Sequence, residues 1–214
     1  MKINDNDDIT VSQQVYSLIR DDIINRRLGP GEKLTIKKLH EKYGASSSPI
    51  REALFRLQQD GLIEYRSNAG MKVAVFTKED LSEIYMLLTE FDIIAMKASM
   101  TPSRKVGTLA TLARSIKRSE ENLDTEAWNY YSDEFHMIFY SEAGNSRLTD
   151  AARKIRAQST VFSSSYEKEP ANRLEIFHQH QSIFNALKAD DLDLAEKLLR
   201  SHIAASYIKA LDTL

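Results

Sequence analysis

Apolar residues in the first third of the chain recur at helical spacing. A first helix is predicted by the apolar positions Val11, Val15, Leu18, Ile19 and Ile23. The sequence "GPGE" at 29–32 is expected to end it, because glycine and proline interrupt helices. A short second helix is predicted from about Thr35 to Tyr43, before Gly44. A third begins within "SSSP" at 46–49 and has an apolar face formed by Ile50, Ala53, Leu54 and Leu57.

The start of the third helix favours contact with a polyanion. Serine is a preferred residue at a helix N-terminus, and proline is tolerated in the first turn. A helix N-terminus also attracts phosphate through its free N–H groups. Arg51 follows one turn later and is long enough to reach a base edge or a phosphate. The same serines would also suit an ordinary helix start, so the segment alone does not establish DNA binding.

Two short segments rich in β-forming residues follow the third helix. "LIEY" and "KVAVF" flank "RSNAGM", which predicts a hairpin with an Asn/Gly turn. Three helices followed by a hairpin form a winged helix-turn-helix, in which the third helix enters the major groove. We therefore predict such a domain over residues 1–76.

Residues 77–214 show only helical periodicity, which predicts an all-α bundle and makes the protein mainly α. No glycine-rich phosphate loop or nucleophile elbow is present in the sequence. Six helices are expected, at about Lys78–Met100, Ser103–Asn122, Thr125–Ala143, Ser146–Tyr166, Ala171–Lys188 and Leu192–Leu211.

The composition is typical of an ordinary water-soluble protein and is compatible with a reducing cytoplasm. The sequence is 42% hydrophobic and 28% charged and contains no cysteine, which excludes disulfides and cysteine metal clusters. The acidic start "MKINDNDDIT" does not resemble a signal peptide, and no apolar run is long enough to span a membrane. We expect a cytoplasmic protein without a membrane partner. Residues 9–76 carry 11 Lys/Arg against 7 Asp/Glu, a weak indication that this part meets a polyanion.

Three histidines are expected to face the interior of the bundle. His180 has apolar residues three and four positions away on both sides, His202 lies among leucines and alanine, and His136 precedes Phe139 and Tyr140. Buried imidazoles need partners, and a shared partner could be a divalent transition metal such as Zn²⁺. Three core histidines with separate hydrogen-bond partners are the alternative.

Residues from about Val11 to Phe76 resemble the DNA-binding domain of the GntR family of bacterial transcription regulators. The matching segments are "PGEKL", "PIREALFRL", "DGLIEY" and "NAGMKV", in order. The resemblance implies a homodimer on a palindromic double-stranded DNA operator. By position, the DNA contacts would be Lys37, Ser46, Ser47, Ser48, Arg51, Asn68 and Gly70. The family usually has an arginine at the position of Ser47, and often one at that of Ala69.

The second part resembles the FCD ligand-sensing domain of the FadR-type branch, in its shorter, VanR-like form. "DEFHMIFYSEAGNSRL" and "HQHQSIFNALKADDLDLAEKLLRSHI" carry the resemblance. It implies that His136, His180 and His202 hold a divalent metal that binds a carboxylate effector. The family's aspartate ligand corresponds to Ser132, so Asp133 is the expected substitute, and Leu88 stands where an effector-binding arginine is common.

The leading hypothesis is therefore a ligand-responsive DNA-binding regulator and not an enzyme. Two alternatives belong to other classes. One is a helical metal-dependent hydrolase with a winged-helix appendage, since three histidines around a metal with an open position also suit hydrolysis. The other is a structural interaction module with no effector.

Overall fold

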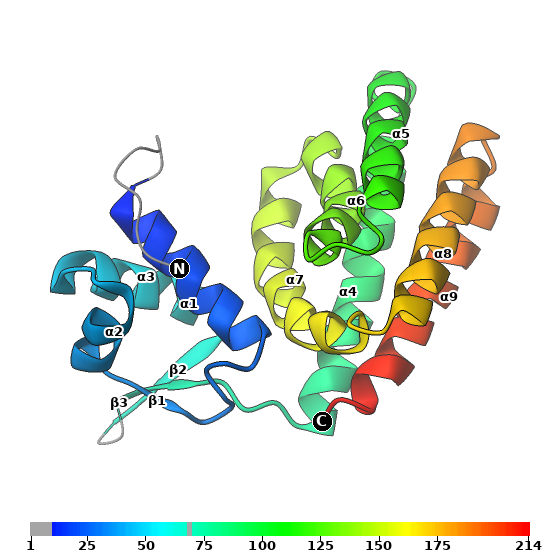
Figure 1. Ribbon diagram of the computed structural model, residues 1–214. Coiled ribbons are helices and arrows are strands. Elements are labelled where there is room, and N and C mark those ends of the chain that lie inside the picture. Colours follow the sequence, from blue (N-terminus) through cyan, green and yellow to red (C-terminus); the bar gives the residue numbers. More distant parts are fainter. Residues whose placement is uncertain (1–9, 68–69) are drawn as a thin grey trace. The chain divides into compact units, whose positions relative to one another are not determined.

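The computed structural model describes residues 10–67 and 70–214, which divide into two compact units (Figure 1). The first unit ends at Thr77 and the second begins at Lys78. Each unit has its own apolar core. No helix among the described residues is long and apolar enough to cross a membrane.

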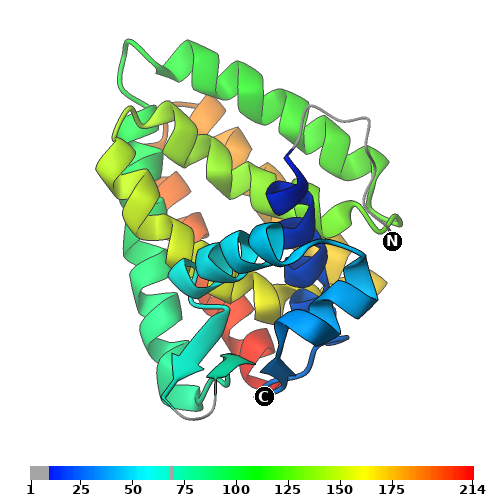
Figure 2. The same ribbon diagram turned by 90° about the vertical axis from the view of Figure 1, so that its left-hand side faces the viewer.

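The first unit contains three helices and a small sheet. Its elements are α1 (Val11–Ile24), β1 (Lys33–Leu34), α2 (Ile36–Tyr43), α3 (Ser47–Gln59), β2 (Ile63–Arg66) and β3 (Gly70–Val73). Helix α3 packs on α1, as the cyan and blue helices in Figure 2 show. The residues that α3 buries are those of the predicted apolar face. The sheet order is β1-β3-β2, with antiparallel pairing from Ile63 opposite Val73 to Arg66 opposite Gly70.

The elements agree with a winged helix-turn-helix, but two details differ from the sequence prediction. Helix α1 ends at Ile24, before "GPGE", and Arg26 takes a left-handed conformation with φ 56°. Strand β1 was not predicted, since two residues carry no periodicity. It adds a third strand to the hairpin by pairing with β3.

A buried carboxylate holds α1 and α2 together. Asp22 accepts a hydrogen bond of 2.7 Å from the Tyr43 hydroxyl and forms ion pairs with Arg27 and Lys42. Burial alone would raise the pKa of Asp22, but the contacts from Lys42, Tyr43 and Arg27 lower it. A buried charge is tolerated when it is paired and hydrogen-bonded in this way.

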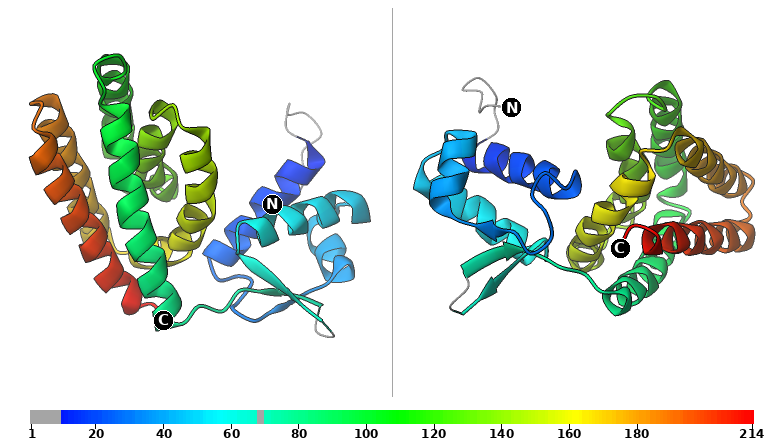
Figure 3. Two further views of the ribbon diagram at one scale, coloured as in Figure 1. Left: turned by 180° about the vertical axis from the view of Figure 1, so that it is seen from behind. Right: turned by 60° about the horizontal axis from the view of Figure 1, so that its bottom comes forward.

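The second unit is an all-α bundle whose described part contains the six predicted helices. They are α4 (Lys78–Ser99), α5 (Lys105–Glu121), α6 (Trp128–Glu142), α7 (Ser146–Tyr166), α8 (Pro170–Lys188) and α9 (Leu192–Leu211). Helix α9 packs against both α4 and α8, which Figure 3 shows from behind. Helices α6 and α7 pack against each other and against α4. Side chains from α4, α6, α7, α8 and α9 can therefore meet in the interior of the bundle.

Candidate DNA and metal sites

The third helix presents a polar, exposed first turn. Ser46, Ser47 and Ser48 are all exposed, and Ser46 stands at the N-cap position. Its hydroxyl makes no capping hydrogen bond, whereas Thr35 accepts one from Lys38 N at 3.2 Å at the start of α2. Ser46 thus occupies the predicted start of the helix without the side-chain cap that serine commonly makes there. The hydroxyl is left available for another partner, such as a phosphate oxygen.

Arg51 lies on the exposed face of α3, one turn after the serines. Neither Arg51 nor Lys37 has a hydrogen-bond or ion-pair partner among the described residues, and both are exposed. Gly70 begins β3 with a positive φ of 75°, which favours glycine at this position. Asn68, the other predicted wing contact, lies outside the described residues.

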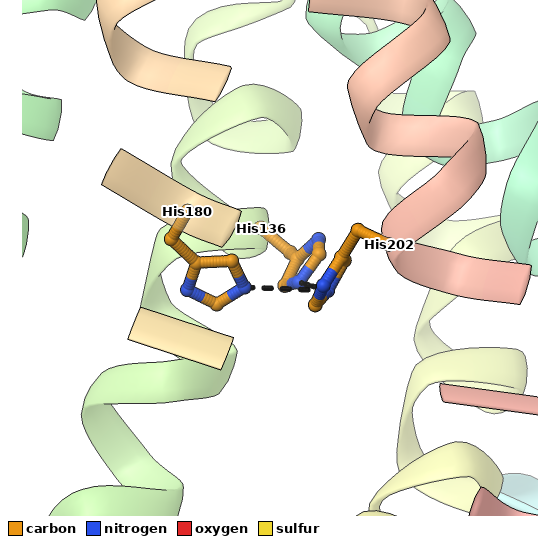
Figure 4. A group of neighbouring side chains, drawn as sticks. All are labelled: His136, His180 and His202. Atoms are coloured by element: carbon orange, nitrogen blue, oxygen red, sulfur yellow. Dashed lines mark hydrogen bonds between the residues drawn. The ribbon is translucent and has the colours of Figure 1, made fainter. Parts of the chain in front are cut away.

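The three predicted histidines meet inside the bundle. His136 comes from α6, His180 from α8 and His202 from α9, and each is at most 5% exposed. His202 Nε2 lies 3.2 Å from His136 Nε2 and 3.3 Å from His180 Nε2 (Figure 4). The Phe135 ring stacks on His180 at a centroid distance of 4.2 Å and fixes the plane of that imidazole.

The neighbours of two imidazoles determine where their protons lie. Asp92 Oδ2 lies 2.8 Å from His136 Nδ1, and Gln179 Oε1 lies 2.7 Å from His202 Nδ1. Both neighbours offer an acceptor oxygen, which favours the tautomer with the proton on Nδ1 and the lone pair on Nε2. In that tautomer the Nε2 lone pairs of His136 and His202 lie 3.2 Å apart, an arrangement that a cation between them would stabilise.

The spacing of the Nε2 atoms suits a tetrahedral metal ion. Zn–N bonds of about 2.0–2.1 Å in tetrahedral geometry separate two nitrogens by about 3.3 Å. The two closest Nε2 pairs match this distance, and the ligand atoms of all three histidines lie within 4.8 Å of one another. Burial lowers the pKa of each of the three imidazoles, which leaves them in the neutral form that binds metals. The donor set thus fits a transition metal.

Asp133, the fourth predicted ligand, lies outside this group of converging donors. Its Oδ1 instead accepts a hydrogen bond of 2.6 Å from Arg156 Nη2. It directly follows Ser132 in the sequence, and the rotation of about 100° per helical residue points the two side chains in different directions. The carboxylate nearest the histidines is Asp92 on α4, which the sequence analysis did not identify. It is preceded and followed by apolar residues, and no motif distinguished it.

Asp92 is a fully buried carboxylate with three partners. It accepts hydrogen bonds from Arg156 Nη1 at 3.0 Å and from the Tyr140 hydroxyl, and it faces His136. Burial alone would raise its pKa, but the charge of Arg156 and the contacts with His136 and Tyr140 hold the pKa of Asp92 at about 2. Asp92 thus remains ionised and orients His136.

A cavity opens beside the histidines. It is lined by His136 and His202 and by polar residues of α6, α7 and the end of α7, including Ser132, Arg156, Ser159, Thr160 and Glu167. Leu88 also lines it, at the position where the family commonly has an arginine. The cavity therefore gives a small ligand access to the histidine cluster.

Comparisons with known proteins agree with both halves of this description. Residues 11–73 match the family described as "Bacterial regulatory proteins, gntR family", and residues 80–205 match the "FCD domain". The chain is 25% identical over 198 residues to the HTH-type transcriptional repressor RspR of Escherichia coli (strain K12), covering 90% of this chain and 86% of that protein.

Two further similarities cover most of the chain. The probable D-xylose utilization operon transcriptional repressor of Paenarthrobacter nicotinovorans is 27% identical over 198 residues, covering 92% of this chain and 87% of that protein. The solved structure of E. coli McbR/YncC shares the fold with a TM-score of 0.72 at 21% identity, covering 96% of this chain and 99% of that chain.

Proposed function

The chain belongs to the GntR family of bacterial regulatory proteins with an FCD domain, and from this premise we propose a zinc-dependent, effector-controlled mode of action. The protein is a DNA-binding transcriptional regulator and not an enzyme, and the hydrolase alternative has no support from its relatives.

The winged helix-turn-helix, over residues 1–76, would bind a palindromic operator as one half of a homodimer in the cytoplasm. Ser46, Ser47 and Ser48 would contact phosphates at the start of α3, and Arg51 would reach a base edge in the major groove. Lys37 on α2 and the wing residues Asn68 and Gly70 would contact the sugar-phosphate backbone of the flanking DNA. Ser47 stands where the family usually has an arginine. Arg51 would therefore be the main residue of α3 that reads a base.

The bundle, over residues 77–214, would hold a divalent metal through His136, His180 and His202. When bound, the metal supplies a Lewis-acidic position for an oxygen of the effector. Asp92 and Gln179 hold two of the rings in the tautomer that binds metal. Effector binding in the adjacent cavity would favour one placement of the two DNA-binding domains in a dimer, and that placement would match or mismatch the half-site spacing.

The observation that carries this proposal is the joint presence of an exposed Arg51 on a recognition helix and three converging imidazoles beside a cavity. Operator selection from a random duplex library, at two salt concentrations, tests the DNA half. We expect a palindrome whose affinity falls steeply with salt. Arg51→Ala should abolish selection, while Arg153→Ala, which removes the same charge from the exposed surface of α7, should not.

Weak, sequence-independent binding by the unchanged protein would contradict the regulator mechanism. The interaction-module alternative makes a different prediction, because a bundle without a metal or effector would melt at the same temperature with and without Zn²⁺.

A further inference from the structure

Phe55 is a large apolar residue on the exposed face of α3. Its side chain is 59% exposed, whereas the aliphatic residues Ile50, Leu54 and Leu57 of the same helix are buried. The structure describes the whole of α3, and the Phe55 ring makes no stacking or cation–π contact with any described residue. Removing such a ring from water in a complex is favourable, so Phe55 is a candidate contact for a partner of this helix.

Phe55 shares one face of α3 with the residues proposed to contact DNA. Ser47, Arg51 and Phe55 follow one another at intervals of four residues, which places them on the same side of the helix. With a rise of about 1.5 Å per residue, Phe55 lies about 6 Å further along the helix axis than Arg51. This distance corresponds to about two base pairs of B-DNA. A helix that brings Arg51 to a base edge therefore brings Phe55 to a neighbouring part of the same groove.

The chemistry of this part of α3 disfavours the DNA backbone and favours base edges. The Phe55 ring has neither a hydrogen-bond donor nor a positive charge, so it gains nothing from a phosphate. Glu52, exposed and three residues before Phe55, would be repelled by phosphates. In the major groove the base edges present one apolar group, the C5-methyl of thymine, which a phenylalanine can contact.

We propose that Phe55 is a specificity-determining residue that contacts the methyl group of a thymine, about one to three base pairs from the base read by Arg51. The inference rests on the proposed function, because it assumes that α3 enters the major groove. Each half-site of the operator is then read in two ways by this helix. Arg51 reads a base through hydrogen bonds, and Phe55 reads a thymine through an apolar contact.

Replacement of single thymines by deoxyuridine in the selected operator tests this contact with the full chain. Deoxyuridine keeps the hydrogen-bonding groups of thymidine and lacks only the C5-methyl. We expect one replacement in a half-site to weaken binding about fourfold, the effect of one methyl group left out of an apolar contact. Fluorescence anisotropy titrations at constant salt measure the affinities. The other replacements in that half-site should have smaller effects.

Variants of Phe55 then assign the effect to this ring. Phe55→Ala should weaken binding to the thymine operator and remove the difference between thymine and uracil at the sensitive position. Phe55→Leu keeps an apolar side chain and should retain part of that difference. Val106→Ala is the control, because it removes an apolar side chain that is 80% exposed from α5, in the other unit. It should leave both affinity and the difference unchanged.

Phe55→Ala should melt at the temperature of the unchanged protein, since substitutions of exposed side chains usually have small effects on stability. The deoxyuridine operators are measured with the unchanged protein, so they test the inference even if a variant folds poorly.

Two results would overturn this inference and leave the proposed function intact. One is a selected palindrome whose affinity no deoxyuridine replacement changes. The other is a difference between thymine and uracil that Phe55→Ala retains. If that variant also changes its oligomeric state in sedimentation velocity, the ring belongs to a protein interface. Selection of no palindrome by the unchanged protein would overturn the proposed function, and this inference with it.

Discussion

Asp92 Oδ2 lies 2.8 Å from His136 Nδ1, although 44 positions separate the two residues in the sequence. The same carboxylate accepts from Arg156, which in turn holds Asp133. Asp92 therefore orients the predicted metal ligand His136, while Asp133, which was predicted to bind the metal itself, binds Arg156. Separate substitutions of Asp92 and Asp133 test which of the two supports metal binding.

Asp92→Asn should weaken Zn²⁺ binding by about 10- to 100-fold, the usual effect of removing a carboxylate that orients a metal-binding imidazole. The amide can no longer stabilise the Nδ1–H tautomer of His136 with a charge. It also leaves Arg156 with one carboxylate partner fewer, which should destabilise the fold by about 3–5 kcal/mol. Competition with a chromophoric chelator measures the affinity, and urea unfolding measures the stability.

Asp133→Asn is the matched control, because it removes the other carboxylate from the same guanidinium without touching the histidines. It should reduce Zn²⁺ affinity by much less than the 10- to 100-fold expected for Asp92→Asn, because Asp133 contacts Arg156 and lies outside the group of histidine ligands. A loss in Asp133→Asn as large as that in Asp92→Asn would show that Asp133 reaches the metal after all.

Zn²⁺ should raise the melting temperature of the bundle, and His202→Ala should abolish the shift. A ligand that binds only the folded state at 100 times its dissociation constant adds about 2.7 kcal/mol of stability. His202 is the imidazole in contact with both others, so its loss leaves two ligands. Differential scanning fluorimetry with and without the metal and EDTA measures the effect. His178→Ala, an exposed residue on α8, is the control and should retain the shift.

Glu167 should make the stability of the protein depend on pH in a specific direction. Burial raises its pKa to about 8, so the folded state holds the proton that the unfolded chain releases near pH 4.5. The contribution of Glu167 to stability is present below pH 4.5 and is lost as pH rises through about 8. Glu167→Gln cannot ionise, so its stability relative to the unchanged protein should rise by about 1.4 kcal/mol per pH unit within that interval.

Urea unfolding of both proteins at several pH values, followed by Trp128 fluorescence, gives this difference directly. A stability difference that stays constant from pH 5 to pH 8 would show that Glu167 is ionised throughout. It would also mean that the cavity is lined by a charged Glu167 carboxylate and not by a neutral carboxyl group.

Helical periodicity was sufficient to predict the six helices of the bundle and the inward direction of its three histidines. The apolar neighbours of His180 three and four residues away place it in the core, and helix geometry fixes that direction. The partners of the histidines could not be predicted in the same way. Asp92 reaches His136 only because α4 packs on α6, and no local pattern encodes that packing. Asp133 was predicted as a metal ligand because it is next to Ser132, where the family has an aspartate. In the structure its carboxylate instead binds Arg156 of α7.

The N-terminus of α3 shows the same limit at the level of one side chain. The serines at 46–48 predicted the start of α3, and Ser46 does occupy the N-cap position, yet its hydroxyl makes no capping hydrogen bond. Which residue stands at a helix boundary follows from local propensity. Whether its side chain folds back on the helix depends on a rotamer that the sequence does not specify.

Ser46→Ala should therefore cost little stability, while Thr35→Ala, at the start of α2, should cost about 1 kcal/mol by removing a cap that is made. Hydrogen–deuterium exchange of the core amides in the first unit measures both changes without interference from the bundle. Ser46→Ala should nevertheless weaken operator binding, since its hydroxyl is free to contact a phosphate. Equal stability losses in the two variants, with unchanged operator affinity for Ser46→Ala, would mean that Ser46 acts as a cap and not as a DNA contact.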